Sequence, residues 1–307
     1  MANFDVIIIG GGPSGLAAGL YLTRGKYRTL LIEKESFGGQ LTKIERIENY
    51  PGFQKGIEGP ALASEMLAQA VAFGLEVDLG EVISLEAYSR SRSVQMSDGR
   101  NITAKAIVIA SGCRRMKLGV PGETEFDGNG VIGCALCDGQ QLAGKKVAVC
   151  GGGDTGITEA LYMTKLALSV VLLEATPEIT ASPILQERAR ADQKLEIRCG
   201  VKVTSIRGET ELNAIELEDS STGKKEILPV GGLLVDIGLE PNTEFISELV
   251  PLDARKRIAV NEKMETGVPY IYAAGDVRSG SPGQVVTGVA DGAVAAIAIQ
   301  KLLQQES

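Results

Sequence analysis

Gly10-Gly11-Gly12-Pro13-Ser14-Gly15 is the stretch that decides the fold of this chain. An apolar run at residues 4–9 precedes it, a helix-like segment at residues 13–23 continues it, and a second apolar run at residues 29–32 ends before Glu33. This order predicts a βαβ unit whose glycine turn lets backbone N–H groups face a pyrophosphate. An acidic residue about 20 positions after the glycines accepts hydrogen bonds from ribose hydroxyls in such units. We therefore expect a dinucleotide to bind here.

The same order of segments returns later in the chain. An apolar run at residues 146–150 leads to Gly-Gly-Gly-Asp-Thr-Gly at residues 151–156, then to a helix-like segment at residues 155–166. A further apolar run at residues 169–173 ends before Glu174. This internal repeat predicts an α/β protein with two Rossmann-like domains. A glycine turn that binds no nucleotide is the alternative, and it has more weight at the second loop than at the first.

Composition limits the classes of function. The 307 residues suit about two domains, and a net charge of −8 disfavours nucleic acid or an anionic membrane surface as a partner. The chain has no histidine, which excludes histidine triads, histidine metal ligands and a histidine general base. The N-terminus has no signal-like pattern and we find no run of about 18 apolar residues, so we expect a cytoplasmic protein without membrane contact.

A pair of cysteines lies shortly before the second glycine loop, in the sequence Cys134-Ala135-Leu136-Cys137-Asp138. Their spacing can bring both sulfurs onto one turn, where they can form a disulfide and where a helix N-terminus can stabilise a thiolate. Asp138 is placed to move a proton during dithiol–disulfide exchange. A metal site is disfavoured because there is no second CxxC and no histidine; a buried pair without function is the other alternative. We expect Cys113, Cys150 and Cys199 to be core thiols.

The rest of the chain fits two α/β halves joined by short hinges. We expect helices at residues 60–73 and 284–303, and strands at residues 81–88, 91–96, 104–110, 201–206, 212–217, 227–235 and 270–273. Proline interrupts strand-like runs near residues 117–121 and 240–244, which we take as the domain boundaries. The basic residues Arg114, Arg115 and Lys117 at the first boundary are either a solvated hinge face or a patch that steers an acidic partner.

Seven motifs in this order resemble the low-molecular-weight thioredoxin reductases over essentially the whole chain. They are GGGPSG at 10–15, GGQL at 38–41, ENYPGF at 48–53, ASG at 110–112, CALCDG at 134–139, GGGD at 151–154 and AAGDV at 273–277. The resemblance implies an FAD-binding domain from residues 1–117 and 246–307. It also implies an inserted pyridine-nucleotide-type domain at residues 118–245 that carries the CxxC, each domain a three-layer ββα structure, and a homodimer.

The resemblance also implies roles for individual residues. Cys137 would face the flavin, Cys134 would attack the partner disulfide, and Asp138 would act as acid and base. Asp276 would hold the ribityl chain, and the helix after Gln284 would approach the flavin ring, where its N-terminus stabilises negative charge. The full FAD set is Gly10, Gly12, Pro13, Ser14, Gly15, Glu33, Lys34, Gly39, Gln40, Leu41, Asn49, Ala110, Ser111, Gly112, Gly275, Asp276, Gln284, Val285 and Val286. The second nucleotide site would comprise Gly151, Gly153, Asp154, Thr155, Gly156 and Glu174.

The sequence departs from this family at two places. NADPH-using members carry a His-Arg-Arg…Arg cluster for the 2′-phosphate, whereas residues 174–180 read Glu-Ala-Thr-Pro-Glu-Ile-Thr here. At about 4 Å and an effective dielectric near 20, each unit charge pair contributes ~4 kcal/mol, so Glu174 repels a phosphate that no cation attracts. A free 2′-hydroxyl, as in NADH or a second FAD, suits a glutamate. In addition, residues 281–284 read Ser-Pro-Gly-Gln and lack the arginine that family members have beside the glutamine near the flavin.

We expect a flavin-dependent disulfide oxidoreductase that reduces thioredoxin or a similar dithiol protein. We expect the electron donor to be ferredoxin or another flavin; NADH is the next choice, and NADPH is disfavoured. Some relatives have lost NADPH use, and this sequence resembles them at the donor site. Two other classes stay open. One is a flavin-dependent ferredoxin/NAD(P) oxidoreductase or oxidase that does not use the CxxC, and the other is a redox-sensing binding protein.

Overall fold

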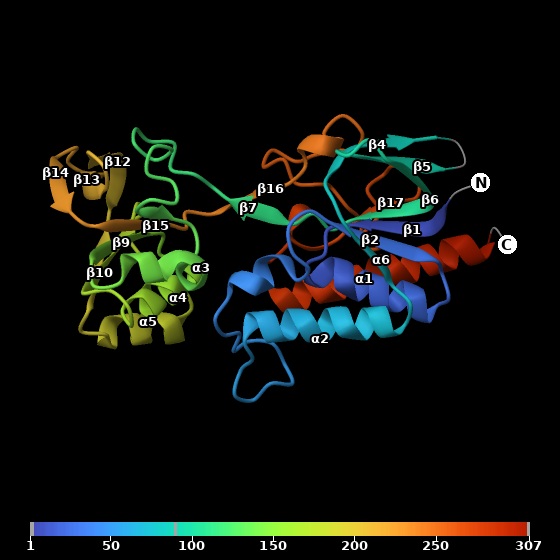
Figure 1. Cartoon of the computed structure of the whole chain (residues 1–307), viewed down its shortest axis with the longest axis horizontal. Helices are drawn as coiled ribbons and strands as arrows, with labels where there is room; N and C mark the ends of the chain where they lie inside the picture. The colour runs from blue at the N-terminus through green and yellow to red at the C-terminus, as the bar shows by residue number, and fades with distance from the viewer. Residues whose placement is uncertain (1–2, 89–90, 306–307) are drawn as a thin grey trace. The chain divides into compact units, whose positions relative to one another are not determined.

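The computed structural model describes residues 3–88 and 91–305, and the chain divides into two compact units. The first comprises Met1–Arg114 and Glu240–Ser307, and the second comprises Arg115–Leu239. The chain passes from one unit to the other at β7 (Cys113–Arg115) and returns at β16 (Leu239–Pro241), and these two strands pair with each other. Both chain ends therefore belong to one unit, and the second unit is an insertion within it (Figure 1).

The first unit is built on a seven-stranded sheet. Its order is β3-β2-β1-β6-β5-β4, with β17 paired to β6. The parallel members are β1 (Phe4–Ile9), β2 (Thr29–Glu33), β3 (Glu76–Leu79), β6 (Asn101–Ile109) and β17 (Ile271–Ala273), and β4 (Val82–Ala87) with β5 (Arg92–Met96) form an antiparallel hairpin. β1 pairs with β2 along one edge and with β6 along the other, and its residues 6–9 are apolar and buried on both faces.

Alternate residues of β1 supply the two faces of this core. Val6 and Ile8 pack with the helices α1 (Pro13–Arg24), α2 (Gly59–Ala72) and α6 (Val285–Gln305), which lie together on one side of the sheet (Figure 1). Ile7 and Ile9 pack on the opposite side with residues of β4, β5 and the segment around η3 (Glu244–Ile246). The short 3₁₀ helices η1 (Gly39–Lys43) and η4 (Gly275–Val277) complete this unit.

The helix α6 is long and apolar enough to cross a membrane by length and composition alone. It is not an unbroken apolar run of the kind sought in the sequence, because Asp291 and Lys301 lie within it. The packing explains the composition: a Cβ on Gly292 would lie 2.0 Å from the carbonyl oxygen of Ser14 in α1, and Ala295, Ala296 and Ile299 are fully buried. One face of α6 thus packs tightly in the core of the first unit.

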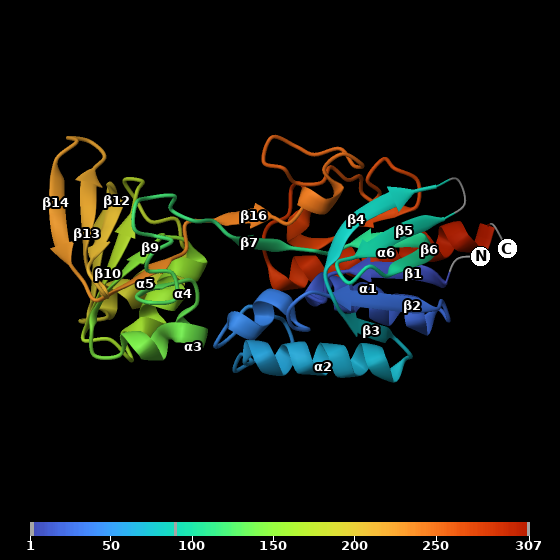
Figure 2. The ribbon, with the colours of Figure 1, turned by 45° about the horizontal axis from the view of Figure 1, so that its top comes forward.

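The second unit repeats the plan with a five-stranded parallel sheet. Its order is β11-β10-β9-β15-β8. The strands are β8 (Val131–Ile132), β9 (Lys146–Cys150), β10 (Ser169–Glu174), β11 (Leu195–Cys199) and β15 (Gly232–Val235). One face packs on α4 (Asp154–Met163) and α5 (Pro183–Ala191), and the other packs on the antiparallel strands β12 (Val201–Gly208), β13 (Leu212–Asp219) and β14 (Lys225–Pro229) (Figure 2). The short helices α3 (Ala135–Asp138) and η2 (Gly139–Leu142) precede β9.

The single strand expected at residues 227–235 is divided in the structure. Lys225–Pro229 is the edge strand β14 of the antiparallel sheet, and Gly232–Val235 is a central strand of the parallel sheet. Pro229 is the last residue of β14, the N–H of Val230 still donates to Asn213 of β13, and the two glycines that follow lead the chain into the other layer. A Cβ on Gly232 would lie 2.6 Å from the Leu142 side chain, which fixes a glycine at the start of β15.

We predict that Gly156→Ala destabilises the second unit whereas Gly153→Ala does not. A Cβ at Gly156 would lie 2.1 Å from the carbonyl oxygen of Gly151, a backbone atom that cannot move aside, so we expect a loss of about 3 kcal/mol. At Gly153 the nearest atom is 3.9 Å away, and we expect a change within about 1 kcal/mol. Urea unfolding followed by circular dichroism measures both variants, and equal stabilities would contradict the close approach.

Candidate functional site

The two glycine loops have the same backbone geometry. Gly10 has φ +110° and Gly151 has φ +115°, values in the region that favours glycine. A Cβ on Gly10 would lie 2.2 Å from the carbonyl oxygen of Ala110, and one on Gly151 would lie 1.9 Å from that of Asp236. Each loop therefore passes directly against the end of the neighbouring parallel strand. This is the position in an open α/β sheet at which ligands bind.

The acidic residues that end β2 and β10 also occupy equivalent positions. Glu33 accepts a hydrogen bond from the N–H of Gly11 at 2.6 Å, and Glu174 accepts one from the N–H of Gly152 at 2.6 Å. The second oxygen of Glu33 accepts from the N–H of Glu35 at 2.8 Å. The second oxygen of Glu174 accepts in the same way from the N–H of Thr176 at 2.8 Å. Both carboxylates are thus fixed at the edge of their glycine loops.

The segment after Glu174 folds back onto the second glycine loop. The N–H groups of Thr180 and Ala181 both donate to the carbonyl oxygen of Gly152, at 2.9 and 3.1 Å. Ala175, Thr176 and Thr180 are exposed on this loop. The loop therefore lies against the second glycine turn, and residues 174–180 contain no lysine or arginine.

In the first unit, hydrogen bonds link several of the residues expected to bind FAD. Asn49 Nδ2 donates to Gln284 Oε1 at 2.9 Å, and Gly275 N donates to Asp291 Oδ2 at 3.1 Å. Asp291 in turn forms a buried two-pronged pair with Arg278, at 2.7 and 2.8 Å. The sequence analysis missed this pair, because an arginine and an aspartate 13 positions apart carry no local signal.

The chain around Asp276 has further support that the sequence analysis did not identify. Asp276 Oδ1 accepts a hydrogen bond from Ser281 Oγ at 2.9 Å, and the Asp276 carbonyl accepts one from the thiol of Cys113 at 3.2 Å. Gln40 Nε2 donates to the carbonyl oxygen of Cys113 at 3.1 Å. Lys34 differs from the others, because its ammonium group pairs with Glu81 at 2.7 Å in an exposed ion pair.

Ser111 is linked to a residue that the sequence analysis also missed. Its hydroxyl donates to the carbonyl oxygen of Asn242 at 2.8 Å, and Asn242 Nδ2 donates back to the carbonyl oxygen of Ser111 at 2.8 Å. This reciprocal pair fixes the chain after β6, next to Gly112 at φ +62°. The residues expected at the first site therefore lie on a backbone held by several side chains of the same unit.

Cys134 and Cys137 form a disulfide, with their Cα atoms 5.4 Å apart. Cys134 precedes α3, and its sulfur accepts a hydrogen bond from the N–H of Cys137 at 3.0 Å. Cys134 is 5% exposed, whereas Cys137 and Asp138 are exposed. Hydrogen bonding to a sulfur favours its thiolate form, so the turn is suited to releasing and holding one thiolate.

A buried ion pair supports this turn. Glu159 of α4 accepts the N–H of Ala135 at 2.6 Å with one oxygen and pairs with Arg115 at 2.5 Å with the other. Glu159 is 7% exposed and the Arg115 side chain 18%. Arg115 is neither part of a solvated hinge face nor of a patch that steers an acidic partner, because its guanidinium is mostly buried and pairs with Glu159. Arg114 and Lys117 are exposed; Arg114 pairs with Glu240 and Glu244, and Lys117 pairs with Asp127.

Asp236, which follows β15, lies in the same buried region. Its Oδ2 atom and the Nη1 atom of Arg115 are both buried without a hydrogen-bond partner among the described residues. Burial raises the pKa of Asp236 to about 6; Arg115 opposes this rise and Glu159 adds to it. Asp236 is therefore a carboxyl group whose charge changes close to neutral pH.

The remaining cysteines differ in exposure. Burial raises the pKa of the Cys113 thiol to about 11 and that of the Cys150 thiol to about 12. Both are buried neutral thiols, as expected of core residues. Cys199 is only partly buried, and burial also raises its pKa. Within residues 3–88 and 91–305, no group of three or more His, Cys, Asp or Glu side chains is arranged to hold a metal ion.

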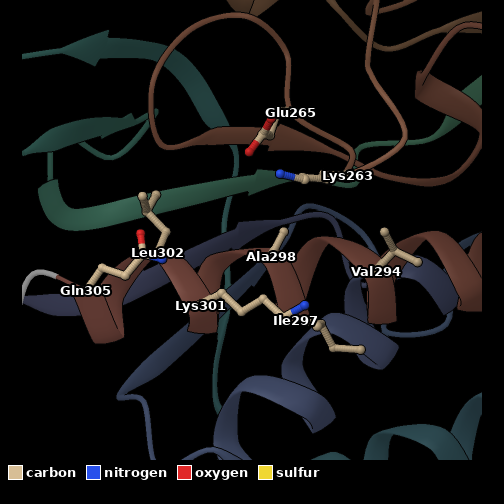
Figure 3. Close-up of a pocket in the computed structure, with 8 residues that line it drawn as sticks. All are labelled: Lys263, Glu265, Val294, Ile297, Ala298, Lys301, Leu302 and Gln305. Carbon is tan, nitrogen blue, oxygen red and sulfur yellow. The ribbon is translucent and has the colours of Figure 1, made fainter.

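The first unit also has a shallow groove of about 350 Å³ along the outer side of α6 (Figure 3). It is lined by Lys263, Glu265, Val294, Ile297, Ala298, Lys301, Leu302 and Gln305. None of these residues belongs to the predicted sites.

Comparison with known proteins gives consistent results. A family model described as pyridine nucleotide-disulphide oxidoreductase matches residues 4–292. The chain is 37% identical to a thioredoxin reductase of Bacillus subtilis, over 98% of this chain and 95% of the relative. It is 36% identical to a bifunctional thioredoxin reductase/thioredoxin of Mycobacterium leprae, over 99% of this chain and 66% of that protein, so it spans about two thirds of that relative.

Solved structures agree with these matches. A Lactococcus lactis thioredoxin reductase aligns with a TM-score of 0.96 and 34% identity, covering 99% of this chain and 100% of that one. A T. acidophilum thioredoxin reductase aligns with a TM-score of 0.94 and 30% identity, covering 98% and 99%. The predicted fold class of two Rossmann-like α/β domains is confirmed.

We predict that Asp236 makes the protein less stable as the pH rises. Its pKa is raised above the usual value of 3.8 to about 6, so the native state binds more protons than the unfolded chain in this range. The stabilising effect of the protonated carboxyl is present at low pH and is lost as the pH rises through about 6, by ~1 kcal/mol between about pH 5 and about pH 7. Asp236→Asn removes this effect. Urea unfolding of both proteins across the range measures it, and a stability difference independent of pH would contradict it.

Proposed function

Because this chain belongs to the pyridine nucleotide-disulphide oxidoreductase family and is a thioredoxin-reductase-like oxidoreductase, we propose that it passes electrons through FAD to the Cys134–Cys137 disulfide and on to thioredoxin or a similar dithiol protein. The family resemblance stated from the sequence is confirmed by these matches. The observation that carries the proposal is a disulfide with one exposed cysteine, Cys137, in a unit that also has a nucleotide-type glycine loop.

The first unit fits FAD. A Cβ on Gly12 would meet no atom within 4 Å, so the middle of the first loop has open space for a pyrophosphate. Glu33 is fixed at the loop edge, where its carboxylate can accept ribose hydroxyls. When bound, FAD supplies a carrier that accepts electrons from a donor and reduces a disulfide. The residues that would hold it are the FAD set given from the sequence, with Asp276 and Gln284 nearest the flavin.

The chain's own residues perform the exchange with the partner protein. Two electrons and two protons convert the Cys134–Cys137 disulfide to two thiols. One of these, as a thiolate, then attacks the partner disulfide and forms a mixed disulfide, which the other thiol resolves, so that the partner leaves as a dithiol. The N–H of Cys137 favours a thiolate at Cys134, and the exposed Asp138 carboxyl can take or give the proton.

We further propose that the donor is not NADPH. Glu174 is held at the edge of the second loop by its hydrogen bond to Gly152, and Ala175, Thr176 and Thr180 provide no cation for a 2′-phosphate. A nucleotide with a free 2′-hydroxyl, namely NADH or a second FAD, suits this carboxylate. Reduced ferredoxin is the remaining donor, and it needs no nucleotide in the second unit. We also propose a cytoplasmic homodimer, on the resemblance to the family.

We predict that Cys134→Ser and Cys137→Ser each abolish reduction of a thioredoxin disulfide, because the exchange needs both sulfurs. Cys199→Ser is the matched control, since it removes a partly buried thiol outside the disulfide; it should keep turnover within about twofold. The assay is thiol formation on thioredoxin with dithionite-reduced enzyme, which is independent of the physiological donor. Turnover that survives loss of both cysteines would favour an oxidoreductase that does not use the CxxC.

We predict that NADPH, added anaerobically, bleaches the flavin absorbance about tenfold more slowly than NADH or reduced ferredoxin, whichever of these two is faster. The variant Ala175→Arg/Thr176→Arg/Thr180→Arg places cations on the exposed positions of the loop and should speed reduction by NADPH. Extraction and counting of flavins per chain shows whether a second FAD is present. Fast bleaching of the natural protein by NADPH would overturn the proposed donor.

A further inference from the structure

We propose that Glu159 and Arg115 are positioning residues that set, with opposite signs, how readily Cys134 becomes a thiolate in the reduced protein. The inference rests on the proposed function only in taking the Cys134–Cys137 pair as a reversible dithiol. It starts from the hydrogen bond between Glu159 and the N–H of Ala135, at 2.6 Å. Ala135 directly follows Cys134, so the anchored peptide group is the one attached to the cysteine itself.

Covalent geometry limits how far the charge of Glu159 is from the sulfur. The Cys134 sulfur and the Ala135 nitrogen are separated by four bonds, which places the bonded Glu159 oxygen at most about 7 Å from the sulfur. Both Glu159 and Cys134 are buried, at 7% and 5% exposure, so water screens this interaction weakly. A unit negative charge at such a distance disfavours a thiolate by roughly fiftyfold at an effective dielectric near 20.

Arg115 opposes this effect. Its guanidinium pairs with the other oxygen of Glu159 at 2.5 Å, so it neutralises the carboxylate and adds a positive charge beneath the turn. Removing Arg115 leaves Glu159 negative and uncompensated, which disfavours the thiolate. Removing the charge of Glu159 leaves Arg115 positive and uncompensated, which favours it. Removing both returns the turn to electrical neutrality.

Two further carboxylates belong to the electrostatic environment of this turn. Asp138 lies on α3 itself and is exposed, and Asp236 approaches from the end of β15, where the charges of Arg115 and Glu159 both act on it. Because burial raises the pKa of Asp236 to about 6, its charge can change during a pH series, so the measurements are made in an Asp236→Asn background as well as in the natural chain. The shifts caused by the other variants should persist in that background.

The test is the pH dependence of alkylation of reduced Cys134 in the FAD-loaded protein. Iodoacetamide reacts with the thiolate, and mass spectrometry of the peptide assigns the modified cysteine. We expect Glu159→Gln to lower the apparent pKa of Cys134 by about one and a half units and the more distant Arg115→Met to raise it by about one unit. Glu159→Gln/Arg115→Met should return it to within about half a unit of the natural protein. Arg115→Lys, which keeps the positive charge, should stay close to the natural value.

An equilibrium with dithiothreitol at about pH 8 provides the second readout. Dithiothreitol loses two electrons and closes its own disulfide, while the Cys134–Cys137 bond opens to the dithiol. The dithiol fraction should rise with Glu159→Gln and fall with Arg115→Met, and each equilibrium constant should change by at most the factor that corresponds to the measured pKa shift.

Shifts in the same direction for both variants, or none, would overturn the inference, because loss of packing alone cannot produce opposite signs that cancel in the double variant. If dithiothreitol fails to open the disulfide of the natural protein, the proposed function fails instead. Circular dichroism and flavin content show that each variant is folded.

Discussion

The absence of a side chain at Gly10 and Gly151 is the constraint on which both units depend. At each position a Cβ would collide with the carbonyl oxygen of the residue that follows the neighbouring parallel strand. Only a glycine lets the first strand, the loop and the helix meet at that point, and a positive φ is needed there in both units. The nucleotide-type loops, the helices behind them and the ends of the adjacent strands are all placed by this contact.

The two loops then differ in what surrounds them rather than in their own geometry. In the first unit, Asn49 contacts Gln284 from a distant part of the chain, and the pair of Arg278 and Asp291 fixes the backbone beside Asp276. In the second unit, the loop is close to a redox turn with its own buried ion pair. The same βαβ unit thus occurs in two different surroundings, which are determined by the residues at the ends of the neighbouring strands.

Local patterns account for what could be predicted from the sequence. The βαβ repeats and the disulfide depend on residues close in sequence, whose spacing fixes their geometry. Arg115 was misread because its partner Glu159 is 44 residues away, and Asp236 was missed because only the fold brings it there. The strand at residues 227–235 was taken as continuous because an apolar pattern does not show which sheet a strand joins. Contacts between residues that are far apart in the sequence are the part of the site that could not be predicted from one sequence.

Arg115 determines where the inserted unit can be cut from the chain as a separate fragment. Arg115 is the first residue of that unit, three residues before the boundary expected at residue 118. A fragment starting at 118 would keep both cysteines and the glycine loop, yet it would leave an oxygen of Glu159 unpaired beneath the disulfide. A fragment of the inserted unit therefore keeps its redox centre intact only when it includes the connecting strand β7. The N-terminal boundary of a stable fragment is determined by the ion pair between Arg115 and Glu159 and not by where the strands of its sheet begin.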